Sequence, residues 1–188
     1  MKSVEEIEQI RKQKREELDL RVNLNSATRE KHILVCRGTG CTSSKSPEII
    51  ENFKKIIEEK NIQNVRVIQT GCFGLCAKGP IVIIRPEDTF YANCKPEDCE
   101  EIIEESIIND RVIERLVYHD QEGKAYEKQE EIPFYKQQTR VALEDCGRIN
   151  AESIKEYIAV GGYSAVAKAL FDMTPQQIVD EISEASLR

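Results

Sequence analysis

Short runs of apolar residues, each bounded by turn residues, divide the middle of the chain into regular elements. Four runs rich in Val, Ile and aromatic residues predict strands; they lie at 33–36, 65–68, 81–84 and 89–93. Apolar residues at helical spacing follow Ser46 and Pro96, and each set predicts a helix with proline at its start. Ser46 is the predicted N-cap of the first helix, with Pro47 at its first position.

The predicted order is strand, helix, strand, hairpin and helix. A helix that joins the first two strands makes them parallel through a right-handed crossover, whereas the hairpin adds antiparallel strands. A Gly-, Ser- and Thr-rich loop follows the first strand, and a loop with several glycines occupies 71–80. We therefore predict an α/β domain of thioredoxin-like layout over 31–109, in which a glycine loop stands in place of a middle helix.

The flanking segments have other patterns. Ser3 to Glu6 form a capping box for a helix that reaches about Leu18. Its narrow apolar stripe favours a solvated, charged arm over 1–30 rather than a docking helix for a partner. Alternation over 18–24 allows a short edge strand. Charged residues around Gly123 predict a linker over 110–138.

Three short helices are predicted over 139–188. Asn150 is the expected cap of the first, the second covers 163–172, and the third begins at Thr174 with Pro175 at its first position. So short a piece buries little core by itself. It is therefore expected to belong to a larger domain.

Composition and charge narrow the classes of function. The chain has 188 residues and a net charge of −7, which argues against nucleic acid as the main partner. It has no run of about eighteen apolar residues and no apolar core of a secretory signal, so we expect a cytoplasmic protein without a membrane span. The cysteines number seven, and thiols stay reduced in the cytosol. Metal binding is therefore favoured over a disulfide scaffold.

Four cysteines form two spaced pairs in the loops that follow the first two strands. Cys36 and Cys41 lie in C-R-G-T-G-C, and Cys72 and Cys76 lie in G-C-F-G-L-C. Because neighbouring parallel strands end at the same edge of a sheet, both pairs are expected to converge on one site. A [2Fe-2S] cluster takes four thiolates, and the surrounding glycines let backbone N–H groups approach the sulfurs. We therefore predict that these four cysteines hold a [2Fe-2S] cluster.

Two rival interpretations use the same cysteines. Structural zinc favours C-x2-C knuckles and would make the domain a non-catalytic assembly module. A thiol-redox enzyme needs C-x-x-C. Both interpretations need two residues between the cysteines, a spacing that neither pair has, and the C-x2-C-x2-C run typical of [4Fe-4S] sites is also absent. Both alternatives remain open to test, since an iron–sulfur protein is brown and a zinc protein is colourless.

The remaining cysteines and the histidines have simpler interpretations. Cys94 and Cys99 repeat the C-x4-C spacing without flanking glycines, and Cys99 falls on an apolar helix face, so we expect both to pack in the core. Cys146 precedes a glycine and has no cysteine near it in sequence, so a structural role is expected. His32 and His119 stand alone, and we expect surface or turn positions for them rather than metal ligation.

The motif C-R-G-T-G-C and the segment T-G-C-F-G-L-C-A-K-G-P-I-V resemble a known family. The chain is similar, over 31–188, to the N-terminus of the NADH-binding flavoprotein subunit of cytosolic, multimeric iron hydrogenases, which is itself similar to the complex I flavoprotein subunit. E-E-I-P-F-Y-K-Q-Q-T-R and the segment from Cys146 to Tyr163 resemble the beginning of the flavin domain of these subunits.

This resemblance implies a function for the whole parent protein. Its thioredoxin-like domain binds [2Fe-2S] at the positions of Cys36, Cys41, Cys72 and Cys76. The parent also carries FMN, NAD(P) and [4Fe-4S] clusters, and it converts a hydride into single electrons within a hydrogenase or NADH dehydrogenase complex. The expected partners are other subunits of that complex and a redox partner with iron–sulfur clusters.

The resemblance also implies what this chain lacks. In the family, a segment like 183–188 runs into the glycine-rich loop that binds FMN and NADH, whereas this chain ends at Arg188. We therefore expect a truncated piece with the electron relay alone, inactive by itself and without catalytic acid–base residues. Arg37, Lys45 and Lys78 flank the ligand loops, and they either steer an acidic redox partner or are ordinary solvated charges.

Overall fold

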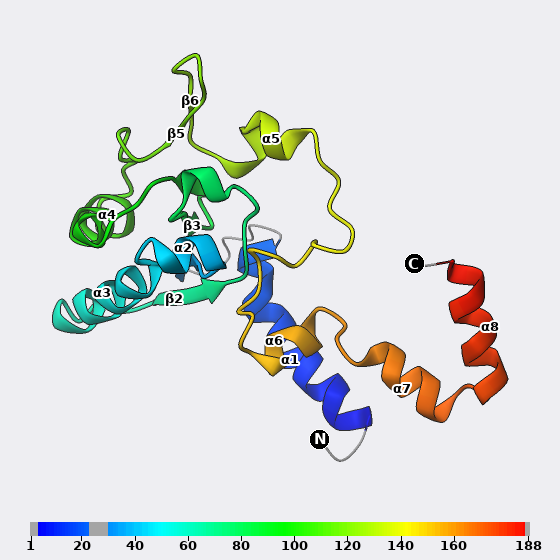
Figure 1. Ribbon diagram of the computed structural model, residues 1–188. Coiled ribbons are helices and arrows are strands. Elements are labelled where there is room, and N and C mark those ends of the chain that lie inside the picture. Colours follow the sequence, from blue (N-terminus) through cyan, green and yellow to red (C-terminus); the bar gives the residue numbers. More distant parts are fainter. Residues whose placement is uncertain (1–3, 23–29, 187–188) are drawn as a thin grey trace.

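A four-stranded mixed sheet forms the centre of the molecule in the computed structural model, which describes residues 4–22 and 30–186 (Figure 1). Its strands are β1 (Lys31–Cys36), β2 (Val65–Thr70), β3 (Val82–Arg85) and β4 (Thr89–Tyr91), in the order β2-β1-β3-β4. β1 runs parallel to β2, whereas β1 with β3 and β3 with β4 are antiparallel. This topology confirms the predicted thioredoxin-like fold.

The sheet is buried on both faces, because successive side chains of a strand point to opposite sides. On β1, Ile33 and Val35 face one core, while Leu34 and Cys36 face the other. The first core is closed by α3 (Ser46–Glu59) and by a helix of mixed geometry. That helix consists of a 3-10 turn (Pro96–Asp98), α4 (Cys99–Ile102) and a π-helix (Ile103–Ile108).

Two local details differ from the predictions. A short helix, α2 (Thr39–Ser43), lies within the predicted loop after β1. α3 begins one residue earlier than predicted, because Lys45 is its N-cap and Ser46 is its first helical residue. Lys45 has a left-handed backbone with φ of 71°, which turns the chain sharply from α2 into α3.

The predicted linker over 110–138 is instead packed on the sheet, where its first part joins the first core and its second part covers the second core. It contains β5 (Tyr118–His119) and β6 (Ala125–Tyr126), which form a small hairpin, a 3-10 turn (Gln129–Glu131) and α5 (Pro133–Lys136). Its buried apolar residues are Ile113, Leu116, Val117, Tyr126, Ile132 and Tyr135. They are scattered among many charged residues, and no helical or strand spacing continues for more than a few residues, so the pattern does not reveal them.

The N-terminal segment docks on the C-terminal part of the chain. α1 (Val4–Val22) continues as a helix through the region where an edge strand was allowed, and residues 23 and 24 of that prediction lie outside the described residues. α1 packs along α6 (Ile154–Ala159), with Leu18 only 3% exposed. α1 is therefore a docked helix rather than a solvated arm, because Leu18 and Arg21 are buried where it packs on a helix far away in sequence.

The last two helices, α7 (Ser164–Phe171) and α8 (Pro175–Ala185), extend away from the rest of the molecule (Figure 1). α8 begins as predicted, with Thr174 as its N-cap. The Thr174 side chain accepts a hydrogen bond from the backbone N–H of Gln177. α6 is capped by Ser153 rather than by the predicted Asn150. Exposed apolar side chains on these two helices are Val166, Leu170, Phe171, Val179 and Ile182.

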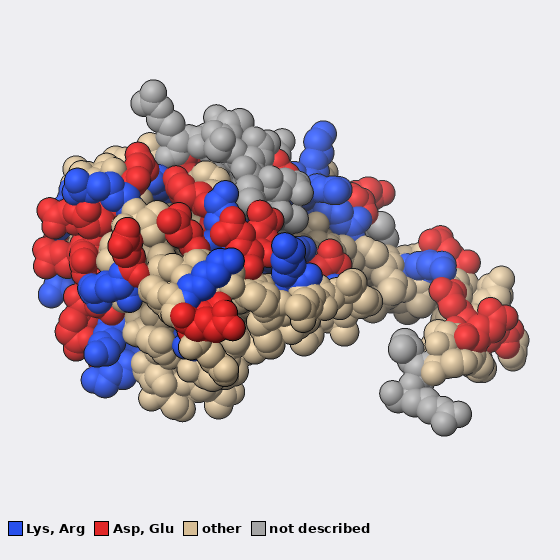
Figure 2. Space-filling model, turned by 90° about the horizontal axis from the view of Figure 1, so that it is seen from above, with Lys and Arg blue, Asp and Glu red and all other residues tan. Residues whose placement is uncertain are grey.

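Charged residues of both signs are mixed over much of the face shown in Figure 2, and uncharged residues form a broad area along its lower edge. Among the described residues, no helix is long and apolar enough to cross a membrane.

Candidate metal centre

The four predicted cysteines lie at one edge of the sheet. Cys36 is the last residue of β1, and Cys41 follows in α2. Cys72 lies in the loop after β2, and Cys76 begins a 3-10 turn that ends at Lys78. Since β1 and β2 are parallel, with Cys36 opposite Thr70, both ligand loops leave the sheet side by side.

The sulfur atoms form a row of neighbours. The Sγ atoms of Cys72 and Cys76 are 3.8 Å apart. The thiols of Cys41 and Cys72 lie near enough to Cys36 to shift its pKa. Two thiolates on one tetrahedral metal, with metal–sulfur bonds of about 2.3 Å, lie about 3.8 Å apart. In the part of the chain that the structure describes, no group of three or more His, Cys, Asp or Glu side chains could hold a single metal ion.

Backbone N–H groups surround the sulfurs. The Gly74 N–H donates to Cys72 Sγ at 3.2 Å. The backbone N–H groups of Gly38 and Phe73 also lower the pKa of Cys36, and that of Ile81 acts in the same direction on Cys41. Such donors stabilise thiolates and the negative charge of an iron–sulfur cluster. The donor set therefore fits the predicted group, with four thiols in two pairs and amides directed at three of them.

Glycine is required where the ligand loops meet. A Cβ atom on Gly79 would lie 2.6 Å from the Cys41 sulfur. A Cβ atom on Gly38 would lie 3.1 Å from Cys72 Cβ. Side chains at these two positions would push the sulfurs out of place, so the glycines of both motifs serve close approach of backbone to sulfur.

The electrostatics of the site favour a thiolate at Cys36. The Cys41 thiol donates to the Cys36 sulfur and, with the two backbone donors, lowers the pKa of Cys36 to about 6 against the opposing effect of burial. The same hydrogen bond raises the pKa of Cys41. Burial raises the pKa of Cys72, and the Gly74 N–H opposes it. Metals bind the deprotonated form, so the site offers one thiolate readily and releases further protons on loading.

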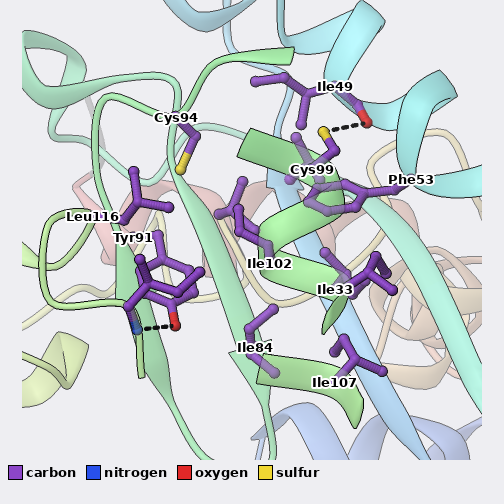
Figure 3. Close-up of a cluster of buried hydrophobic side chains, with 14 of the residues drawn as sticks. Ile33, Ile49, Phe53, Ile84, Tyr91, Cys94, Cys99, Ile102, Ile107 and Leu116 are labelled. Carbon is purple, nitrogen blue, oxygen red and sulfur yellow. Dashed lines mark hydrogen bonds between the residues drawn. The ribbon is translucent and has the colours of Figure 1, made fainter. Parts of the chain in front are cut away.

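Cys94 and Cys99 pack in the first core, as predicted (Figure 3). The Cys99 thiol donates to the carbonyl of Ile49 at 3.6 Å, and burial raises its pKa to about 12. Burial also raises the pKa of Cys94. Both cysteines are therefore protonated small hydrophobes in neutral solution.

Contacts from the C-terminal part of the chain were not foreseen. The Cys146 sulfur lies 3.9 Å from the position of a Cβ atom on Gly71, beside the second ligand loop. Gly147 has φ of +85°, and a Cβ atom there would lie 2.5 Å from the ring of Phe73. The Cys146–Gly147 pair thus packs directly on the loop between the ligands. The only sequence signal was this isolated Cys-Gly pair.

The two histidines differ in exposure. His119 is exposed on β5, in agreement with its predicted surface position. His32 is buried on β1, with Nε2 3.4 Å from the Glu30 carboxylate, so its predicted surface or turn position is wrong. Burial lowers the pKa of His32, and the nearby charge of Arg21 acts in the same direction.

The basic residues near the ligand loops have partners. Arg37 donates to the side chain of Gln69 at 2.8 Å, and Lys45 lies 3.6 Å from the Glu48 carboxylate. Lys78 donates to the carbonyl of His119 at 3.3 Å. These contacts support the interpretation of ordinary surface charge at least as well as that of partner steering.

Comparison with known proteins agrees with the site. The family model for thioredoxin-like [2Fe-2S] ferredoxins matches residues 23–106. A [2Fe-2S] ferredoxin of Clostridium pasteurianum is 42% identical over 94 residues, which cover 45% of this chain and 92% of that protein. The chain therefore belongs to the family of thioredoxin-like [2Fe-2S] ferredoxins, whose members transfer electrons through a [2Fe-2S] cluster.

Further similar proteins include another small ferredoxin and a subunit of a larger enzyme. A [2Fe-2S] ferredoxin of Aquifex aeolicus is 35% identical over 97 residues, 46% of this chain and 87% of that protein. A crystal structure of the thioredoxin-like ferredoxin of that organism aligns at 29% identity with a TM-score of 0.45, covering 48% of this chain and 98% of that one. The NADP-reducing hydrogenase subunit HndC of Solidesulfovibrio fructosivorans is 47% identical over 53 residues, 28% of this chain and 11% of that subunit.

Proposed function

We propose that Cys36, Cys41, Cys72 and Cys76 are the ligands through which this domain transfers single electrons. The paired sulfurs at the end of β1 and β2, with amides directed at them, are the observation that carries the proposal. A bound [2Fe-2S] cluster supplies the one-electron chemistry. Cys36 and Cys41 are buried, whereas Cys76 is exposed, so the protein shields one side of the site and presents the other to a redox partner.

The cofactor content of purified protein tests this proposal. After anaerobic reconstitution, about two irons and two sulfides per chain are expected, with a brown colour and one-electron reduction. The chain alone is expected to contain no flavin. Zinc in place of iron, in a colourless protein, would instead favour a non-catalytic assembly module. Disulfide reductase activity without iron would favour a thiol-redox enzyme.

We further propose that the chain works within a cytoplasmic, NAD(P)-linked hydrogenase or NADH dehydrogenase complex. The similarity to HndC supports this assignment, together with the resemblance of the segments near 131–140 and 146–163 to the beginning of a flavin domain. On this proposal, the residues described here supply the [2Fe-2S] relay. FMN, NAD(P) and [4Fe-4S] clusters are cofactors of the larger assembly, and its iron–sulfur subunits are the redox partners.

We propose a folded unit that starts at residue 31 and extends to 138, rather than one that ends at 109, because the segment 110–138 is packed on the sheet. Limited proteolysis is therefore expected to cut first within 136–144, where Val141 is 81% exposed. Mass spectrometry of the fragments should identify a brown core that ends near Lys136 or Arg140. First cuts between 110 and 118, with loss of colour, would restore the linker interpretation.

A further inference from the structure

One peptide group in the second ligand loop is hydrogen-bonded at both ends. It joins Phe73 to Gly74, whose N–H donates to the Cys72 sulfur at 3.2 Å. The carbonyl of the same peptide, on Phe73, accepts from the Tyr135 hydroxyl at 3.1 Å. Because a peptide is planar, the direction of the carbonyl fixes the direction of the N–H. Tyr135 therefore contacts the group that donates to a ligand sulfur.

Tyr135 is held firmly in this position. It lies in α5 and is 8% exposed. Its ring packs edge-on against the ring of Phe90, with centroids 5.9 Å apart. The guanidinium of Arg140 lies 5.0 Å from the centroid of the Tyr135 ring. The Tyr135 hydroxyl donates to the Phe73 carbonyl, and this hydrogen bond is buried.

The loop itself needs such a support. Gly74 has φ of +91°, a conformation that glycine adopts readily. Because glycine also adopts other conformations readily, its own backbone preference does not hold the peptide in this direction. The Phe73 side chain is buried and anchors one side of the peptide. Among the described residues, the Tyr135 hydroxyl is the hydrogen-bond donor to the Phe73 carbonyl.

We propose that Tyr135 is a positioning residue that sets the reduction potential of the cluster through the Phe73–Gly74 peptide. This inference rests on the proposed ligand role of Cys72. A hydrogen bond accepted by a peptide carbonyl polarises the N–H at its other end and strengthens the bond that it donates. A stronger N–H bond to a ligand sulfur stabilises the reduced cluster, which carries more negative charge, and so raises the potential.

The variant Tyr135→Phe tests the proposal, with Tyr126→Phe as the matched control. Tyr126 lies in the same core and in the same covering segment, but its hydroxyl donates to Asp120 at 3.0 Å. Tyr135→Phe is expected to keep its cluster and to disfavour reduction at least threefold, which for one electron is a shift of about 30 mV to more negative potential. Tyr126→Phe is expected to keep the wild-type potential.

Pulsed electron paramagnetic resonance of the reduced protein in D2O gives a second readout, because it reports the exchangeable Gly74 amide hydrogen next to the cluster. Its coupling is expected to weaken in Tyr135→Phe alone. Should that variant lose its cluster, 3-fluorotyrosine placed at position 135 keeps the ring and offers a stronger donor, so the potential should rise.

Three results overturn the proposal: equal potentials in wild type and Tyr135→Phe with an intact cluster, an equal shift in Tyr126→Phe, or no rise with 3-fluorotyrosine. Absence of any cluster from the wild-type protein would instead overturn the proposed function. The failure of one is thus distinguishable from the failure of the other.

Discussion

Serine in place of Cys72 is expected to abolish or strongly alter the visible spectrum of the reconstituted protein. The hydroxyl of serine is a much poorer iron ligand than a thiolate, and the pair with Cys76 at 3.8 Å would be broken. The same loss is expected for Cys36→Ser, because it removes the thiol whose pKa is lowered to about 6 and which therefore offers a thiolate readily. Iron and sulfide content, with absorption and paramagnetic resonance spectra, measure the effect.

Cys94→Ser and Cys99→Ser are the matched controls. Both thiols are fully enclosed in the first core, and the Cys99 thiol already donates to the backbone carbonyl of Ile49. Their replacement is expected to lower stability by about 1–3 kcal/mol, because a hydroxyl is more polar than a thiol, and to leave the spectrum nearly unchanged. Bleaching in these variants, with an intact spectrum in Cys72→Ser, would show that the ligand assignment is wrong.

The candidate site could be predicted because its signals are local. Spacing within each cysteine pair is a property of a few consecutive residues, and the parallel strands β1 and β2 follow from the helix that joins them. The glycines that carry no side chain towards Cys41 and Cys72 stand in the same two motifs. Sequence alone therefore indicated which cysteines meet, although the ligand assignment itself stays a proposal.

The surroundings of the site could not be predicted, because they come from distant parts of the chain. Tyr135 contacts a carbonyl 62 residues away, and Arg21 contacts Glu156 across 135 residues. Neither contact leaves a pattern in its own segment. The charged residues of 110–138 lie mostly outside, and six of its apolar residues lie inside. A solvated connector and a packed cover therefore have nearly the same composition.

The contact of Arg21 with Glu156 links the two ends of the chain to the ligand loop. The guanidinium donates to the Glu156 carboxylate at 2.9 Å and to the backbone carbonyl of Arg148 at 3.1 Å. The carboxylate also accepts from the backbone N–H of Asn150 at 2.7 Å. Asn150 in turn bridges to Thr70, two residues before Cys72. α1 therefore supports the segment that packs on the second ligand loop.

Arg21→Met is expected to lower the free energy of unfolding by about 3–5 kcal/mol, because it leaves the Glu156 carboxylate buried without its partner. The Arg21 side chain is 1% exposed. Water therefore cannot reach and solvate the Glu156 carboxylate in the variant unless the contact of α1 with α6 opens. Denaturant titration of the wild type and the variant measures the loss. Hydrogen exchange should show the α6 amides losing protection first if the contact opens before the sheet unfolds.

The double variant Arg21→Met with Glu156→Leu provides the control. It removes both charges and substitutes apolar side chains of similar size, so most of the loss should be recovered; replacing a buried ion pair in this way is often neutral or stabilising. The Asn150 N–H would still lose its acceptor, which leaves a residual cost of about 1–3 kcal/mol. If Arg21→Met changed stability by less than about 0.5 kcal/mol, as substitutions at exposed sites do, α1 would not be docked on α6 in solution. The N-terminal segment would then be the solvated arm that its narrow apolar stripe first indicated.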